Sequence, residues 1–457
     1  MKIAKVIPLF KKGDTDNVDI YRPISILPSF SKILERLVFN RLSSFLVHFN
    51  ILSNEQYGFR KNSSTGLAIL DLYDKIVHYV DVNNHTICVF MDFSKAFVSI
   101  PHDILLVKLH FYGVRGLPHK WFKSYLAERK QFTSVNSHCS FLNPISYGVP
   151  RGSLLGPPLV LIYINDIVNC STFCKFTLFA DDTTILASEK KIDLLTHKLN
   201  INLEYVYEWL VCNKLSLNVS KTKFVIFKNA RNLNPVYDNV SISINNRLIE
   251  QCRVFNYLGV LFDENLSWTS HINYITKKVS QSVGIISHLR FVIPLRILFM
   301  LYNAFILPYI MYCNSVWATK HPSKLLKLHR LQKRALRLCS NSPFLAPSQP
   351  LFRKFNTLHI YDINKLQIAS LMQRFFSNSL PPNLMHLFSL NNVVHTHYTR
   401  NADKFHHWNA SSNILTDSLR YVGPKMWNSL PPFLQSVGFN NSFKRLYKKH
   451  LLSLYNA

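Results

Sequence analysis

Apolar and polar positions alternate with two different periods up to about residue 268, which predicts a succession of helices and strands. Residues 30–48 are predicted to be a helix, since apolar side chains recur at helical spacing at Ile33, Leu34, Leu37, Val38 and Leu42. Further helices are predicted over 67–82, 103–128 and 191–212, and strands or hairpins over 86–92, 176–188, 223–228 and 255–263. This order is typical of an α+β domain with an antiparallel sheet.

The rest of the chain is predicted to be mainly helical and basic. A stretch rich in proline and serine at residues 340–350 is predicted to link two helical regions. Residues 291–313 form an apolar run long enough to cross a bilayer, but the run contains Arg296 and two prolines. We interpret it as a buried helix of a large domain, with a membrane helix as the alternative.

The charge of the chain favours a polyanionic partner. Lys and Arg number 53 against 25 Asp and Glu, so the formal net charge is +28, and the basic residues lie along the whole chain. Such a surface suits nucleic acid better than a membrane, the alternative being a basic protein without such a partner. The eight cysteines have no zinc-finger spacing. With no signal peptide expected, we predict reduced thiols in an intracellular protein.

Two adjacent carboxylates, Asp181 and Asp182, lie at the turn of the hairpin predicted over residues 176–188. One aspartate in a turn needs no special explanation, because its side chain accepts hydrogen bonds from nearby backbone N–H groups. Two neighbouring charges at the edge of a core repel each other and lose hydration unless a cation is present. Asp92 ends another predicted strand, and if the two strands are neighbours the three carboxylates suit a pair of Mg²⁺ ions. Unrelated turn or capping aspartates are the alternative.

Seven stretches of the chain carry a family resemblance. They are "KVIPLFKKGD…YRPISILPSFSKILERLV", "LSNEQYGFRKNSST", "MDFSKAFVSIPHDILL", "GVPRGSLLGPPLVLIYINDI", "FADDTT", "LSLNVSKTKFVIF" and "FNYLGVLFDENLSW". In this order they resemble the reverse transcriptases of non-LTR (LINE-like) retrotransposons of the jockey type. The C-terminal "GPKMWNSLP" is also similar to these elements, so the resemblance covers nearly the whole chain.

The resemblance implies a right-hand polymerase fold and an RNA-directed DNA polymerase, a nucleotidyltransferase that extends a primer 3′-hydroxyl. Fingers and palm would occupy residues 1–268, a helical thumb 269–340, and a mainly helical basic C-terminal region 341–457. Two Mg²⁺ ions would be the cofactors, with Mn²⁺ as a substitute. The implied partners are an RNA template, a DNA primer and deoxynucleoside triphosphates, with no membrane. We expect a nuclear and/or cytoplasmic location.

The resemblance also assigns roles to single residues. Asp92, Asp181 and Asp182 would be the catalytic metal ligands. The residues implied to contact the incoming nucleotide are Lys11, Lys12, Arg22, Phe97, Arg151, Gly152 and Lys223, and those implied to contact template or primer are Arg60 and Ser153. Phe97 would exclude a 2′-hydroxyl and Lys223 would donate a proton to pyrophosphate. The alternatives are a core aromatic for Phe97 and a solvated basic face for the cations.

Two features depart from the family pattern. The first fingers stretch begins almost at Met1, so we expect no N-terminal endonuclease domain and a separate endonuclease as a partner. Arg151 stands in "PRG" where the family has a neutral glutamine. Two interpretations therefore remain open, an active polymerase and a catalytically decayed retrotransposon copy that only binds nucleic acid.

Overall fold

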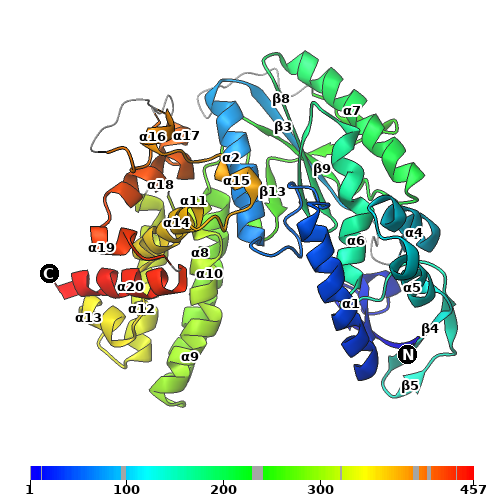
Figure 1. Ribbon diagram of the computed structural model, residues 1–457. Helices are drawn as coiled ribbons and strands as arrows, with labels where there is room; N and C mark the ends of the chain where they lie inside the picture. Colours follow the sequence, from blue (N-terminus) through cyan, green and yellow to red (C-terminus); the bar gives the residue numbers. More distant parts are fainter. Residues whose placement is uncertain are drawn as a thin grey trace.

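A central sheet, in the upper middle of Figure 1, lies between two groups of helices. The structure is a computed structural model that describes residues 2–11, 13–93, 99–228, 240–319, 322–394, 401–408, 413–438 and 440–456. The strand order is β12 (Glu250–Gln251), β9 (Lys223–Phe227), β3 (His85–Met91), β8 (Asp182–Glu189) and β7 (Lys175–Phe179). Every neighbouring pair is antiparallel except β9 with β12. The predicted α+β class with an antiparallel sheet is confirmed.

The centre of this sheet is buried on both faces. In β3, Ile87 and Val89 join one hydrophobic cluster while Cys88 and Phe90 join another, because successive side chains of a strand point to opposite faces. The first cluster includes residues of α4 (His102–Phe111), α5 (Gly116–Leu126), α6 (Gly156–Ile164) and α7 (Ile192–Cys212), and the second includes α2 (Thr65–Asp81). The 3₁₀ segments η1 and η2 span Val18–Ile20 and Asn165–Cys170. The single helix predicted over 103–128 is in fact two, α4 and α5, because a turn at Gly113 (φ +92°) separates them.

A second sheet joins the N-terminal strands to residues 129–145. Strand β1 (Ile3–Phe10) pairs antiparallel with β2 (Tyr21–Ile26) and parallel with β4 (Arg129–Val135), and β4 also pairs with β5 (His138–Cys139) and β6 (Asn143–Ile145). Helix α1 (Ser29–His48) follows β2, as predicted. Its predicted apolar face is only partly in the core, since Ile33 and Leu37 are 58% and 59% exposed. The inner face holds the buried Glu35, which accepts hydrogen bonds from the Tyr125 hydroxyl and the Leu154 N–H.

The C-terminal half is mainly helical and packs as one continuous hydrophobic cluster with α2 (Figure 1). It is preceded by the paired strands β10 (Ser243–Ile244) and β11 (Arg247–Leu248), whose Ile244 belongs to the other cluster, and it starts with the paired strands β13 (Val254–Tyr257) and β14 (Val260–Asp263). The helices are α8 (Thr269–Leu289), α9 (Leu295–Phe305), α10 (Leu307–Met311), α11 (Asn314–Trp317), α12 (Pro322–Cys339), α13 (Gln349–Lys354), α14 (Ile360–Phe376), α15 (Pro382–Met385), α16 (Asn391–Val394), α17 (Asn413–Thr416), α18 (Leu419–Asn428), α19 (Pro432–Gln435), α20 (Asn440–Ser453) and the 3₁₀ segment η4 (Leu454–Asn456). Arg420 of α18 forms a bidentate ion pair with the buried Asp74 of α2, at 2.7 and 2.8 Å. The C-terminal region is therefore attached directly to the central sheet's covering helix.

The apolar run at residues 291–313 is divided between α9 and α10. Leu298 and Tyr302 are fully buried, whereas Met300 and Phe305 are 57% and 46% exposed. The predicted buried helix is therefore found only in part, because the run divides into two helices before Pro308 and only one side of it faces the core. Within the described ranges, we find no helix with both the length and the apolar character needed to span a bilayer.

Candidate active site

The strand register brings Asp92 and Asp182 to the same edge of the central sheet. Met91, the last residue of β3, pairs with Thr183 of β8, so the next residue, Asp92, follows opposite Asp182. Strands β7 and β8 form the predicted hairpin, with Phe179 paired to Asp182 and Asp181 in the two-residue turn. The condition set by the sequence, that the two strands be neighbours, is met.

The three carboxylates are close enough to interact. Loss of hydration at the sheet edge, then repulsion from Asp181 and Asp92, raises the pKa of Asp182 from 3.8 to about 6. This shift occurs although one side of Asp182 is open to solvent. Negative charge at this edge is therefore incompletely compensated by the protein itself.

The donor set at this edge fits a hard divalent cation. Asp92 and Asp182 line a cavity of about 210 Å³ together with residues of β13, and carboxylate oxygens are the ligands that Mg²⁺ prefers. A cation there would relieve the repulsion that raises the pKa of Asp182. The described residues nevertheless contain no group of three or more acidic, histidine or cysteine side chains arranged to hold one metal ion.

Cationic side chains from the second sheet and the following loop surround the carboxylates. Lys11 and Arg22 both act to lower the pKa of Asp182, so their charges lie near it. Burial lowers the pKa of Arg151, and the nearby charge of Asp181 opposes that effect. The structure thus brings Lys11, Arg22 and Arg151 to the carboxylate edge. Lys12 and Phe97, for which nucleotide contacts are predicted, lie outside the described residues.

A lysine that sequence reasoning missed, Lys221, lies near Asp92. Its ammonium is 3.8 Å from the Asp92 carboxylate, and it lines the 210 Å³ cavity. The expected lysine, Lys223, is instead ion-paired with Glu250. The antiparallel register explains the difference, because Lys223 pairs with Phe90 and the residue two positions earlier comes opposite Asp92. Both lysines stand in "SKTKF", so the strand pairing was the missing signal.

The loop that contains Arg151 is fixed to β2 by its backbone. The Ser25 N–H donates to the Arg151 carbonyl at 2.6 Å. Gly152 has φ +114°, and a Cβ there would lie 2.4 Å from the Ser25 carbonyl oxygen, so only glycine fits. Ser153 is buried, and its hydroxyl accepts a hydrogen bond from the Gly156 N–H at 2.8 Å, at the start of α6. The close backbone approach at Gly152 is therefore made with β2.

A second segment that sequence reasoning missed holds the turn that carries Asp181. The Tyr57 N–H donates to the Leu178 carbonyl at 2.8 Å, so residues 55–58 run beside the end of β7. The buried side-chain oxygen of Gln56 accepts hydrogen bonds from the Gly58 N–H (2.7 Å) and the Ala180 N–H (3.0 Å). Ala180 directly precedes Asp181 and has φ +54°. Gln56 and Gly58 therefore fix the backbone of the turn.

Arg60, expected to contact template or nucleotide, also supports this segment. Its guanidinium donates to the carbonyls of Ser53 and Gln56. Burial lowers its pKa, although the nearby Tyr57 and Glu55 oppose that effect. The contacts of Arg60 in the structure are therefore internal ones.

Comparison with known proteins identifies the family. A family model described as "Reverse transcriptase (RNA-dependent DNA polymerase)" matches residues 10–262, which is more than half of the chain and includes all three carboxylates. The chain belongs to the reverse transcriptase family. The match begins in β1 and ends in β14, so the carboxylate edge and the surrounding cations lie inside the reverse transcriptase region.

Two curated relatives are retrotransposon proteins that are longer than this reverse transcriptase chain. The RNA-directed DNA polymerase from mobile element jockey of Drosophila melanogaster is 29% identical over 80% of this chain and 40% of its own length. The protein of the same name from Drosophila funebris is 28% identical over 75% of this chain and 38% of its own length. The chain thus spans about 40% of these relatives. Apo telomerase from Candida tropicalis aligns with 79% of this chain and 62% of its own, at 10% identity and a TM-score of 0.43, too low to carry an argument.

The raised pKa of Asp182 predicts that this reverse transcriptase gains stability when that carboxylate is neutralised. Asp182→Asn is expected to increase the free energy of unfolding at pH 7, with EDTA present, by about 1 kcal/mol. A change in pKa from 3.8 to about 6 corresponds to about 3 kcal/mol, which solvent screening of this exposed group reduces. Because the folded-state pKa is raised, the folded chain holds the proton more tightly, and its stability falls as pH rises from about 4 to 6.

Urea denaturation of parent and variant at several pH values tests this prediction. The difference between them should be negligible near pH 4 and should reach its full size above about pH 6. Asp103→Asn is the matched control, since this exposed carboxylate lies 4.0 Å from Lys214 in a surface pair of little energetic value. An Asp182→Asn variant less stable than the parent at pH 7 would contradict the assignment of unrelieved repulsion.

Proposed function

We propose that the chain is the RNA-directed DNA polymerase of a non-LTR retrotransposon, which extends a primer 3′-hydroxyl by two-metal nucleotidyl transfer. The observation that carries the proposal is the register of β3 and β8, which sets Asp92 opposite Asp182 with Asp181 in the adjoining turn. Membership of the reverse transcriptase family and the similarity to jockey polymerases support it.

Asp92, Asp181 and Asp182 are the proposed metal ligands, and Mg²⁺ is the proposed metal, with Mn²⁺ as a substitute. Once bound, the metal ions would supply activation of the hydroxyl and neutralisation of triphosphate charge. The protein's own contribution is to hold the ligands at one edge of a buried, rigid sheet. The described residues contain no preformed group of three metal ligands. Metal binding would therefore require small rotations of the carboxylate side chains.

The cations around the carboxylates are proposed to bind the triphosphate. Lys11 and Arg22 reach this edge from the second sheet, and charge-assisted hydrogen bonds from such groups stabilise phosphate oxygens. Lys221 lies in the turn before β9, with its ammonium 3.8 Å from the Asp92 carboxylate, where it can donate a proton to the leaving pyrophosphate. This role is proposed for Lys221 in place of Lys223, whose ammonium is paired with Glu250.

The parts of the chain are proposed to act as in a right hand. Residues 1–268 are the fingers and palm, 269–340 the thumb, and 341–457 a basic helical region. The template is RNA, the primer DNA and the substrates deoxynucleoside triphosphates, which the net charge of +28 suits. A separate endonuclease is the proposed source of the primer end.

Primer extension on poly(rA)/oligo(dT) tests the function directly. We expect synthesis with Mg²⁺ or Mn²⁺ and none with EDTA. Binding of the same primer–template should weaken as salt is raised, since neutralised phosphates release counterions. Binding without any synthesis at either metal would reject the polymerase and leave the decayed copy.

The second candidate function, a catalytically decayed copy that only binds nucleic acid, is favoured by the position of Arg151, whose charge lies near Asp181. An attraction of about 4 kcal/mol is expected for a pair about 4 Å apart at an effective dielectric of about 20, and a third of it changes affinity about tenfold. We therefore expect Arg151→Gln to extend primers faster at limiting nucleotide, by lowering the nucleotide or Mg²⁺ concentration needed about tenfold. Steady-state titrations of both ligands measure it. A slower glutamine variant of an active parent would show that Arg151 is a working nucleotide contact.

A further inference from the structure

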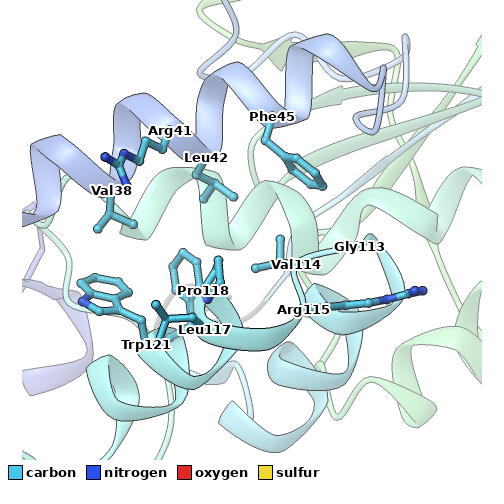
Figure 2. A pocket seen from close by; sticks show the side chains of 11 residues that line it. Val38, Arg41, Leu42, Phe45, Gly113, Val114, Arg115, Leu117, Pro118 and Trp121 are labelled. Atoms are coloured by element: carbon cyan, nitrogen blue, oxygen red, sulfur yellow. The ribbon is translucent and has the colours of Figure 1, made fainter.

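A groove runs between α1 and α5, outside the site described above. One cavity of about 510 Å³ is lined by residues of α1 from Val38 to Phe45 and by residues 113–122. Figure 2 shows Val38, Leu42 and Phe45 on α1 facing the segment that carries Val114, Leu117 and Trp121. A second cavity of about 150 Å³, lined by Leu34, Glu35, Tyr125 and Arg129 among others, shares Trp121 with the first. The two cavities therefore adjoin at Trp121.

Arg129 makes the smaller cavity chemically unusual. Its side chain is 3% exposed, and its Nε and Nη2 atoms are buried without a hydrogen-bond partner in the structure. One other nitrogen, Nη1, donates to the Tyr125 carbonyl at 3.2 Å, and the guanidinium lies 4.8 Å from the Tyr125 ring centre. The carboxylate of Glu35 in the same cavity is already bonded to Tyr125 and Leu154. A buried guanidinium without an anionic partner is costly, and an incoming carboxylate would relieve that cost.

The larger cavity is apolar, with cations at its edge. Among the described residues that line it, Arg41 and Arg115 carry charge and none is acidic. Exposed apolar side chains continue the surface, since Leu117 is 80% and Leu34 46% exposed. An apolar groove bordered by arginines is complementary to an apolar ligand surface that also carries negative charge.

We propose that this groove binds an amphipathic α-helix of a protein partner, with an acidic side chain paired to Arg129. From Ser31 to Phe45 the groove follows 15 residues of α1, whose ends lie about 21 Å apart at 1.5 Å per residue, which matches a helix of about four turns. Glu35 lines the smaller cavity and Leu42 the larger one. At 1.5 Å per residue these two positions lie about 10 Å apart along α1. The partner helix therefore carries its acidic residue about two turns from its main apolar anchors. This docking site is independent of the proposed polymerase activity.

Selection from a displayed library of 16-residue amphipathic helices, with the whole chain as target, tests the proposal. We expect enriched sequences to share an acidic residue two turns from a pair of apolar residues. A synthetic peptide of the enriched type, measured by fluorescence anisotropy, should lose about tenfold or more in affinity when its acid becomes the amide. Arg129→Gln should cause the same loss, and the two changes together should cost no more than either alone, as for a direct pair.

Control variants separate binding from folding and from catalysis. Leu117→Asp should abolish peptide binding without unfolding the chain, because Leu117 is 80% exposed. Arg36→Gln, an exposed arginine of α1 outside both cavities, removes the same charge and should leave the affinity unchanged. Asp182→Asn should also bind normally. The proposal is overturned if no helix is enriched or if Leu117→Asp binds the peptide as the parent does. It is also overturned if the effects of Arg129→Gln and of the acid-to-amide change in the peptide add fully, or if dodecanoate alone binds as tightly as the peptide.

Discussion

Replacement of Asp92, Asp181 or Asp182 by asparagine is expected to reduce metal-dependent primer extension by about 10³-fold or more in each case. Asparagine keeps the size of the side chain but removes the charge that holds a divalent cation. The register places Asp92 and Asp182 side by side, and loss of hydration, followed by repulsion from Asp181 and Asp92, raises the pKa of Asp182. Each carboxylate should therefore contribute to metal affinity.

Nucleic-acid binding separates loss of chemistry from loss of the protein. One charge changes a net +28 very little, so each variant should bind primer–template at moderate salt within about threefold of the parent. Asp103→Asn serves again as the matched control and should extend primers normally. Single-nucleotide incorporation with Mg²⁺ measures the loss. Near-normal incorporation by any one variant would remove that aspartate from the site.

The arrangement of the carboxylates could be predicted from the sequence because it depends on strand periodicity. The apolar run before Asp92 and the two runs around Asp181 and Asp182 each read as strands with a fixed end, and the structure pairs them as β3, β7 and β8. What the runs leave open is the partner of each strand. The choice between Lys221 and Lys223 depends on the register of β9 with β3, and no local pattern contains that register.

Other features were missed because an apolar pattern does not show which of its positions are covered. The stripe of apolar residues on α1 suggested a core face, but Glu35 takes the inner position and bonds Tyr125 and Leu154. In the run at residues 291–313, hydropathy indicated burial, while α9 faces the core with only one side and leaves Met300 exposed. Periodicity reports which face is apolar, and the packing of other segments decides whether that face is covered.

The support of the Asp181 turn by residues 55–58 was also invisible in the sequence. The pairing joins segments more than a hundred residues apart, and the side-chain oxygen of Gln56 accepts from both Gly58 and Ala180. Gly58 is packed against that turn so closely that an added Cβ would lie 2.4 Å from the Ala180 nitrogen and 3.1 Å from its Cα. These are backbone atoms, so a side-chain rotation cannot relieve the contact.

Gly58→Ala is therefore expected to lower the rate of single-nucleotide incorporation by about 10²-fold, because the turn that carries Asp181 must shift by about 1 Å. Gln56→Met should act in the same direction, since it leaves the N–H groups of Gly58 and Ala180 buried without an acceptor, at about 1–3 kcal/mol each. Gly66→Ala is the matched control, because its Cβ would meet the Cys313 sulfur at 3.7 Å and the Ser64 hydroxyl oxygen at 3.8 Å, both ordinary contact distances. Melting temperatures of all three variants, measured alongside incorporation, separate a displaced turn from an unfolded chain. If Gly58→Ala incorporates nucleotide within about threefold of the parent rate, residues 55–58 only pack against the hairpin, and the position of Asp181 is fixed by β7 and β8 alone.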